Sequence, residues 1–178
     1  MTRVPPVDPE NTTPDRRAAH EEGEERFGRM TNMKRTLLHS LPAYHALMEW
    51  YTLRDLVAPF LGERLTNIFS HAISAETDCL ICSTYFRRIL IDAGEDVDHL
   101  ALDEREQAVV EFGRCLAAPF ARVPDDVYER VSAHFDDEQM IALTAFGAMM
   151  VATNVLNNAL DVPLDDYLQP YRRAEAEA

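Results

Sequence analysis

Glycine is scarce in this sequence, and the few glycines form no cofactor-binding motif. Only six of the 178 residues are glycine. None of them builds the glycine-rich loop that cradles phosphates or the fingerprint that binds a dinucleotide. The sequence therefore offers no motif for a nucleotide, and we expect the protein to need no cofactor.

Basic residues are also in the minority. The chain has 17 lysines and arginines against 31 aspartates and glutamates, which gives a formal net charge of −14. Nucleic acids and anionic membrane surfaces are polyanions, so they repel a protein of this charge. We therefore expect neither as a partner.

Long hydrophobic runs are missing from the chain by inspection. We find no stretch that approaches the roughly 18 apolar residues needed to cross a bilayer. The opening "MTRVPPVDPENTTPDRR" lacks the apolar segment of a signal peptide. These absences favour a cytoplasmic protein without a membrane partner, in a compartment where thiols stay reduced.

Cysteine is rare, but two of the three cysteines lie close together. Cys79 and Cys82 form a CxxC in "AETDCLICSTYF". A zinc site needs two further ligands at suitable spacing, yet there is no second CxxC, and Cys115 and His71 are isolated. We therefore expect no metal. In a reducing compartment a CxxC is more often catalytic or metal-binding than a structural disulfide, and without further ligands catalysis is favoured.

The abundant signal is helical periodicity, and it predicts an all-α protein of one domain. Residues 1–13 are rich in proline and are expected to form an extended N-terminal arm. Residues 14–170 are expected to form a single helical domain, and residues 171–178 a frayed C-terminal tail. Thr13 followed by Pro14 is a helix start signal, and Gly28 is expected to end that helix.

The further helices are predicted from apolar spacing and from residues that start or stop helices. They are a short helix in "NMKRTLLHS", one that begins after Ser40, one over Glu63 to Ser74, one capped by Asp78 and ended by Gly94, one capped by Asp103 and stopped by Pro119, a short one in "PDDVYERVSAHF", and a long apolar one in "DDEQMIALTAFGAMMVATNVLNNAL".

The cysteine pair gains a chemical meaning from its place at a helix start. With Asp78 as the cap, Cys79 takes the first helical position and Cys82 the fourth. Unpaired backbone N–H groups and the helix dipole stabilise thiolates there, and residues at i and i+3 share a face, so the sulfurs can form a disulfide. A dithiol oxidoreductase follows from this geometry, while two inert buried thiols and a zinc ligand pair stay open as alternatives.

The chain from Arg3 to Leu168 resembles the carboxymuconolactone decarboxylase and alkylhydroperoxidase D superfamily. The resemblance lies in the CxxC at a helix start and in the segments "LDERE", "HFDDEQMIALTAFGAMM" and "NNALDVPLD". It implies an all-α, alkylhydroperoxidase D-like fold that assembles as a trimer, hexamer or dimer. It also implies thiol-dependent peroxide reduction, with Cys82 as the attacking thiolate, Cys79 as the resolving partner, and a thioredoxin-like or dihydrolipoamide-type reductant.

Two departures from the superfamily pattern affect proton transfer. Asn67 stands where the pattern has a glutamate, and Phe86 stands where it has a histidine, so the inherited proton relay cannot operate. His71 lies one turn after Asn67 and is the candidate replacement base, although a lone histidine on an apolar helix is more often a core residue. Tyr85 is too weak a base and is expected to line a pocket.

The sequence thus predicts a thiol-dependent oxidoreductase, of the peroxiredoxin type, that reduces hydroperoxides through a dithiol–disulfide cycle of Cys79 and Cys82. Two other readings stay open. One is a redox-sensing, non-enzymatic relative that has lost the relay, and the other is a small-molecule enzyme of the decarboxylase or lactone type.

Overall fold

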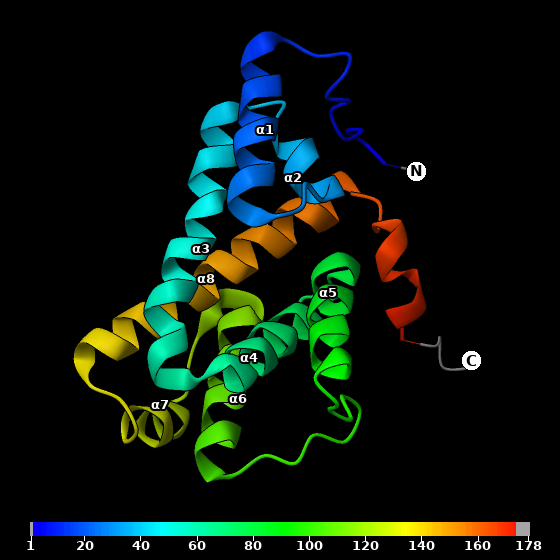
Figure 1. The fold of residues 1–178 in the computed structure, drawn as a ribbon. Helices are drawn as coiled ribbons and strands as arrows, with labels where there is room; N and C mark the ends of the chain where they lie inside the picture. The colour runs from blue at the N-terminus through cyan, green and yellow to red at the C-terminus, as the bar shows by residue number, and fades with distance from the viewer. Residues whose placement is uncertain (1, 174–178) are drawn as a thin grey trace.

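The computed structural model describes residues 2–173, and within this range the chain contains helices and no strand (Figure 1). The all-α prediction is therefore confirmed. The elements are α1 Pro14–Phe27, α2 Asn32–Leu37, α3 Leu41–Leu61, α4 Glu63–Glu76, α5 Leu80–Asp92, α6 Glu104–Ala117, the 3-10 turn η1 Pro119–Ala121, α7 Asp125–Ser132, α8 Asp137–Leu160 and the 3-10 helix η2 Asp166–Tyr171.

Most helix ends follow from the residues that mark them. Pro14 is the first residue of α1, and Gly28 ends it in the left-handed conformation at φ 73°. Asp103 caps α6 and Asp136 caps α8, each in a reciprocal capping box with the residue three positions on. The two 3-10 elements were not predicted.

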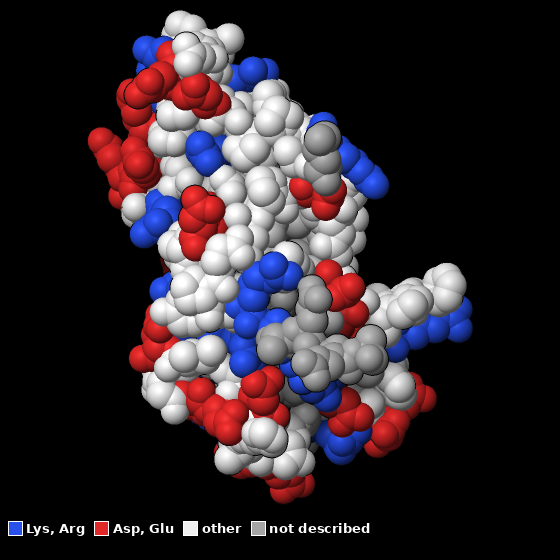
Figure 2. All heavy atoms as spheres, turned by 90° about the vertical axis from the view of Figure 1, so that its right-hand side faces the viewer, with Lys and Arg blue, Asp and Glu red and all other residues white. Residues whose placement is uncertain are grey.

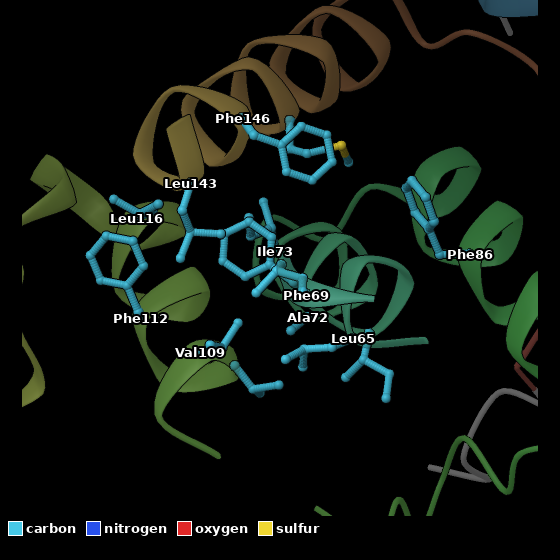
Figure 3. Close-up of a cluster of buried hydrophobic side chains, with 14 of the residues drawn as sticks. Leu65, Phe69, Ala72, Ile73, Phe86, Val109, Phe112, Leu116, Leu143 and Phe146 are labelled. Atoms are coloured by element: carbon cyan, nitrogen blue, oxygen red, sulfur yellow. The ribbon is translucent and has the colours of Figure 1, made fainter. Parts of the chain in front are cut away.

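Helix α8 is the central element of the bundle. It packs against α3, α4, α5 and α6 and crosses the middle of the molecule (Figure 1). Figure 3 shows its Phe146 beside Phe69 of α4, and the two rings are stacked with centroids 6.0 Å apart. Gly147 permits the close approach to α6, since a Cβ at this position would lie 2.5 Å from Cδ1 of Leu116.

The length and composition of α8 correct one sequence expectation. By length and composition alone this 24-residue helix is apolar enough to cross a membrane, although it holds no unbroken apolar run, and the core helix of a soluble protein meets the same criterion. The polar residues that interrupt the run explain the difference: Thr153, Asn154 and Asn157 are buried against the rest of the protein.

The N-terminal segment is packed against the helices. Val7 is buried and its N–H donates to the carbonyl of Arg35 in α2. The N–H of Arg3 donates to the carbonyl of Leu160 at the end of α8. At the other end, Tyr171 donates to Asp92 of α5, whereas residues 174–178 of the predicted tail lie outside the described residues.

Candidate active site

The turn between α4 and α5 places the cysteines, and it differs from the prediction in one detail. Asp78 is not the cap of α5. It adopts a left-handed backbone with φ 50°, and Cys79 is the residue that precedes the first helical residue, Leu80. The reason is that α4 continues to Glu76, so the chain must reverse within Thr77 and Asp78 before α5 can begin.

Cys79 and Cys82 are both reduced and buried, and they interact directly. Cys79 is fully inaccessible, whereas Cys82 retains 7% exposure. The interaction with the neighbouring thiol of Cys82, helped by backbone N–H groups, lowers the pKa of Cys79. The interaction with Cys79, together with burial, raises the pKa of Cys82 well above its ordinary value. The stabilisation expected at a helix start is thus found at Cys79, while Cys82 holds the proton.

An asparagine of α8 touches both sulfurs, and sequence reasoning did not single it out. Nδ2 of Asn157 lies 3.3 Å from Sγ of Cys82 and 3.9 Å from Sγ of Cys79. The neighbouring Asn154 donates to Oγ1 of Thr77, and Asn158 to the carbonyl of the same residue. Helix α8 therefore fixes both the turn and the thiols. The available signal was a set of polar residues at helical spacing within an otherwise apolar helix.

Cys82 also faces a cavity of about 440 Å³, whereas Cys79 does not. The walls come from the end of α1, the α1–α2 turn, α2, α3, α5, α8 and η2, and six of the nineteen lining residues are aromatic. The aromatic lining residues are Phe27, Trp50, Tyr51, Tyr85, Phe86 and Tyr167. Because Gly28 and Arg29 are lining residues that are exposed, the cavity opens at the α1–α2 turn.

A buried lysine lines the same cavity. Lys34 of α2 is 5% exposed, and its Nζ donates to the carbonyl of Arg29 at 3.0 Å. The ammonium also lies over the rings of Phe27 and Tyr51, 4.7 and 5.1 Å from their centroids. Burial lowers the pKa of Lys34 to about 8, an effect partly offset by the negative charge of Asp165. Sequence reasoning missed this residue, although it is the only lysine in the chain.

The two residues that depart from the superfamily pattern are both buried, in different surroundings. Phe86 lies in the cavity wall, with its ring centroid 6.2 Å from that of Trp50 and 5.2 Å from that of Tyr85. The amide of Asn67 donates to the carbonyl of Glu63 within α4. Neither side chain supplies a base to the thiols, and Tyr85 lines the cavity as expected.

His71 is not brought to the sulfurs. No hydrogen bond recorded for the described residues joins it to either thiol. Burial lowers the pKa of His71 to about 4, and the positive charge of Arg87 adds to this effect. His71 is therefore a weaker base than a free histidine. The proton-relay role of His71 stays a prediction that this geometry does not favour.

The remaining ligand-type residues form no centre. Cys115 lies on α6 and is half-buried, and it does not line the cavity. Among residues 2–173, no group of three or more histidine, cysteine, aspartate or glutamate side chains is arranged to hold a metal ion.

Comparison with known proteins gives a match in structure but not in sequence. No family model matches the chain, and no curated protein matches it. A solved structure of the debrominase Bmp8 superposes with a TM-score of 0.78 at 16% identity, over 96% of each chain. A cysteine-to-alanine variant of Bmp8 in complex with 2,3,4-tribromopyrrole gives 0.79 at 15% identity, also over 96% of each chain.

A second kind of neighbour carries the name of the superfamily inferred from sequence. The alkylhydroperoxidase AhpD core of an uncharacterized peroxidase-related protein from Ralstonia eutropha JMP134 superposes with a TM-score of 0.70 at 19% identity, over 94% of each chain. The chain therefore has the alkylhydroperoxidase D-like helical fold, as the sequence predicted.

Proposed function

We propose that the protein is a thiol-dependent reductase in which Cys79 and Cys82 cycle between dithiol and disulfide. The observation that supports this most directly is the shared site of the two sulfurs. Both sulfurs accept from Asn157, each shifts the pKa of the other, and of the two only Cys82 lines the cavity. Inert core thiols would need neither the asparagine nor the cavity.

In this proposal Cys79 replaces the missing base. The coupled thiols share one proton, and the form in which Cys79 holds that proton leaves a thiolate at Cys82 facing the cavity. Asn157 donates to both sulfurs, so it stabilises the negative charge on either sulfur. No residue at the positions of Asn67 or Phe86 is then required.

A hydroperoxide is the substrate class that we favour. The Cys82 thiolate attacks the outer oxygen, the S–O bond forms as the O–O bond breaks, and the alkoxide takes the proton held by Cys79 and leaves as an alcohol. The Cys79 thiolate then attacks the sulfenic acid, the S–S bond forms, and hydroxide leaves. A thioredoxin-like or dihydrolipoamide-type dithiol would reduce the disulfide.

A second candidate is reductive dehalogenation of a halogenated aromatic ring. It is favoured by the aromatic walls of the cavity beside Cys82 and by the structural likeness to a debrominase whose variant holds 2,3,4-tribromopyrrole. The electrons balance in the same way. Two thiols become one disulfide, the C–Br bond is replaced by a C–H bond, and bromide and one proton are released.

The test compares both substrates with the same variants. An organic hydroperoxide or a bromopyrrole is incubated with a dithiol reductant, and peroxide loss or bromide release is followed. We expect Cys82→Ser to abolish turnover and Cys79→Ser to stop after a single event. Cys115→Ser, the control outside the cavity, should retain the wild-type rate. Equal rates for wild type and Cys82→Ser would overturn the proposal.

The redox-sensing alternative has its own signature in this experiment. It requires a Cys79–Cys82 disulfide that forms and is reduced reversibly, without catalytic consumption of either substrate. Mass spectrometry of alkylated protein before and after reduction measures the disulfide independently of turnover.

A further inference from the structure

We propose that the cavity binds a planar aromatic molecule that carries an anionic group, and that Lys34 is the residue that binds this group. The inference rests on the proposed function and deepens it, because it adds an aromatic ring and an anionic group to the molecule on which the thiol acts, whether that molecule is a hydroperoxide or a halogenated ring. It rests on the charge and position of Lys34, on the other residues of the cavity and on the placement of Cys82.

The first argument is that Lys34 is a buried cation without an ion-pair partner. Lysine is almost never this inaccessible unless it is paired, yet no carboxylate of residues 2–173 lies within salt-bridge distance of Lys34. The negative charge of Asp165 acts on the Lys34 ammonium only from beyond salt-bridge distance. Of the three donors of the ammonium, one is accounted for by the carbonyl of Arg29. The cavity therefore contains a charge that a ligand can neutralise.

The second argument is the sign of the charge around the cavity. The chain as a whole has a net charge of −14, but the described residues that line the cavity include Lys34, Arg29 and Arg88 and no aspartate or glutamate. Arg88 is paired with Asp92 outside the lining, so Lys34 and Arg29 are the cations left to face a ligand. Figure 2 shows basic side chains gathered near the middle of the face that carries η2.

The third argument is shape. Aromatic rings on several sides favour a flat, conjugated ligand, since such a ligand can stack on them. A cavity of about 440 Å³ lies in the range that encloses small organic ligands. Lys34 and Cys82 line the same cavity from different helices, so a ligand held by its anionic group presents another part of its ring to the thiol.

The experiment measures binding without chemistry and uses the only tryptophan of the chain as the reporter. Trp50 lines the cavity, so its fluorescence is followed while benzoate, or its neutral isostere benzamide, is added to the full chain at pH 7. We expect benzoate to bind at least tenfold more tightly than benzamide. In Lys34→Met most of this preference should be lost, with benzamide binding unchanged.

Two controls keep the result interpretable. Arg130→Gln removes a positive charge on α7, away from the cavity, and should leave the preference intact. Lys34→Met removes a buried charge, so the variant should fold, which circular dichroism verifies. Arg29→Gln provides a second variant at the mouth and should weaken benzoate binding more than benzamide binding.

The inference and the proposed function fail separately. Equal affinity of wild type for benzoate and benzamide, or an unchanged preference in Lys34→Met, would overturn the role of Lys34 even if the thiols turn over substrate. A charge preference that depends on Lys34 and persists in Cys82→Ser would support it even if no turnover is found.

Discussion

At the scale of single residues, Asn157 is the side chain that couples α8 to the chemistry of the thiols. It donates to both sulfurs, and a hydrogen bond to a charged group contributes about 1.5–3 kcal/mol. We expect Asn157→Leu to slow alkylation of the reduced pair by iodoacetamide at neutral pH about tenfold or more. Asn158→Ala is the control, because Asn158 is exposed and donates to the turn and not to a sulfur. Equal alkylation rates for wild type and Asn157→Leu would contradict the role of Asn157.

Lys34 should make stability depend on pH in a defined window. Its pKa is lowered by burial from 10.5 to about 8, so between these values the unfolded chain binds more protons than the folded one. The free energy of unfolding should therefore rise with pH, by about 1.5 kcal/mol between about pH 8 and pH 9.5. Below pH 8 the lysine is charged in both states and this dependence vanishes.

Urea denaturation at several pH values measures this effect as the difference between wild type and Lys34→Met. The difference removes the contribution of Tyr51 and Tyr167, whose pKa values are raised by burial and which act at higher pH in the opposite direction. A difference between the two proteins that stays constant across the window would contradict a buried, charged Lys34.

The residues of the site were predictable to different degrees. Cys79 and Cys82 stand out because a CxxC is a local pattern, and the absence of a base at Asn67 and Phe86 follows from residue type alone. Asn157 and Lys34 do not stand out, because their meaning depends on contacts across many residues of sequence. The electrostatic difference between the two thiols also depends on packing, since it arises from burial and from the backbone N–H groups near Cys79.

At the scale of elements, the contact between α4 and α6 depends on a residue without a side chain. A Cβ at Gly113 would lie 2.8 Å from Cε2 of Phe69, which is fully buried. We expect Gly113→Ala to lower the free energy of unfolding by about 1–2 kcal/mol, because overpacking outweighs the better helix propensity of alanine. Arg114→Ala, at the exposed neighbouring position, should stay within about 0.5 kcal/mol of wild type. Urea denaturation checks both, and a Gly113→Ala protein as stable as wild type would show that Phe69 moves freely.

Helix boundaries were predicted well where a single residue determines them, as at Pro14 and Gly28. The start of α5 was misplaced by one residue because Asp78 is a good cap by type, yet here it has a left-handed backbone. The contacts of the turn with α4 and α8 set the conformation of Asp78. A capping preference, which depends on residue type alone, does not predict it.

At the scale of the whole molecule, the N-terminal segment stabilises the half of the cavity that contains Lys34. Val7 is buried and bonded to α2. We expect Val7→Ala to lower the free energy of unfolding by about 1.5 kcal/mol, the cost of removing two buried methyl groups. The exposed change Glu10→Ala is the control, and thermal or urea denaturation is the measurement. A stable Val7→Ala protein would show that the arm contributes little.

The fold was predictable from the sequence because helical spacing, caps and the placement of the CxxC agree along the whole chain. The cavity was not, because its walls come from helices near both ends of the chain as well as from α5. The assembly into a trimer, hexamer or dimer stays a prediction, which light scattering on the purified protein can check.

The cavity wall has one more consequence, which concerns the lifetime of the protein as a catalyst. Met33, Met48 and Met150 line the same space as Cys82, and the indole N–H of Trp50 donates to the sulfur of Met150 at 2.7 Å. Thioethers react with peroxides to give polar sulfoxides, so a hydroperoxide that enters meets three oxidisable sulfurs besides the thiol. A peroxide substrate would progressively inactivate the protein that consumes it, whereas a halogenated ring would leave these methionines intact.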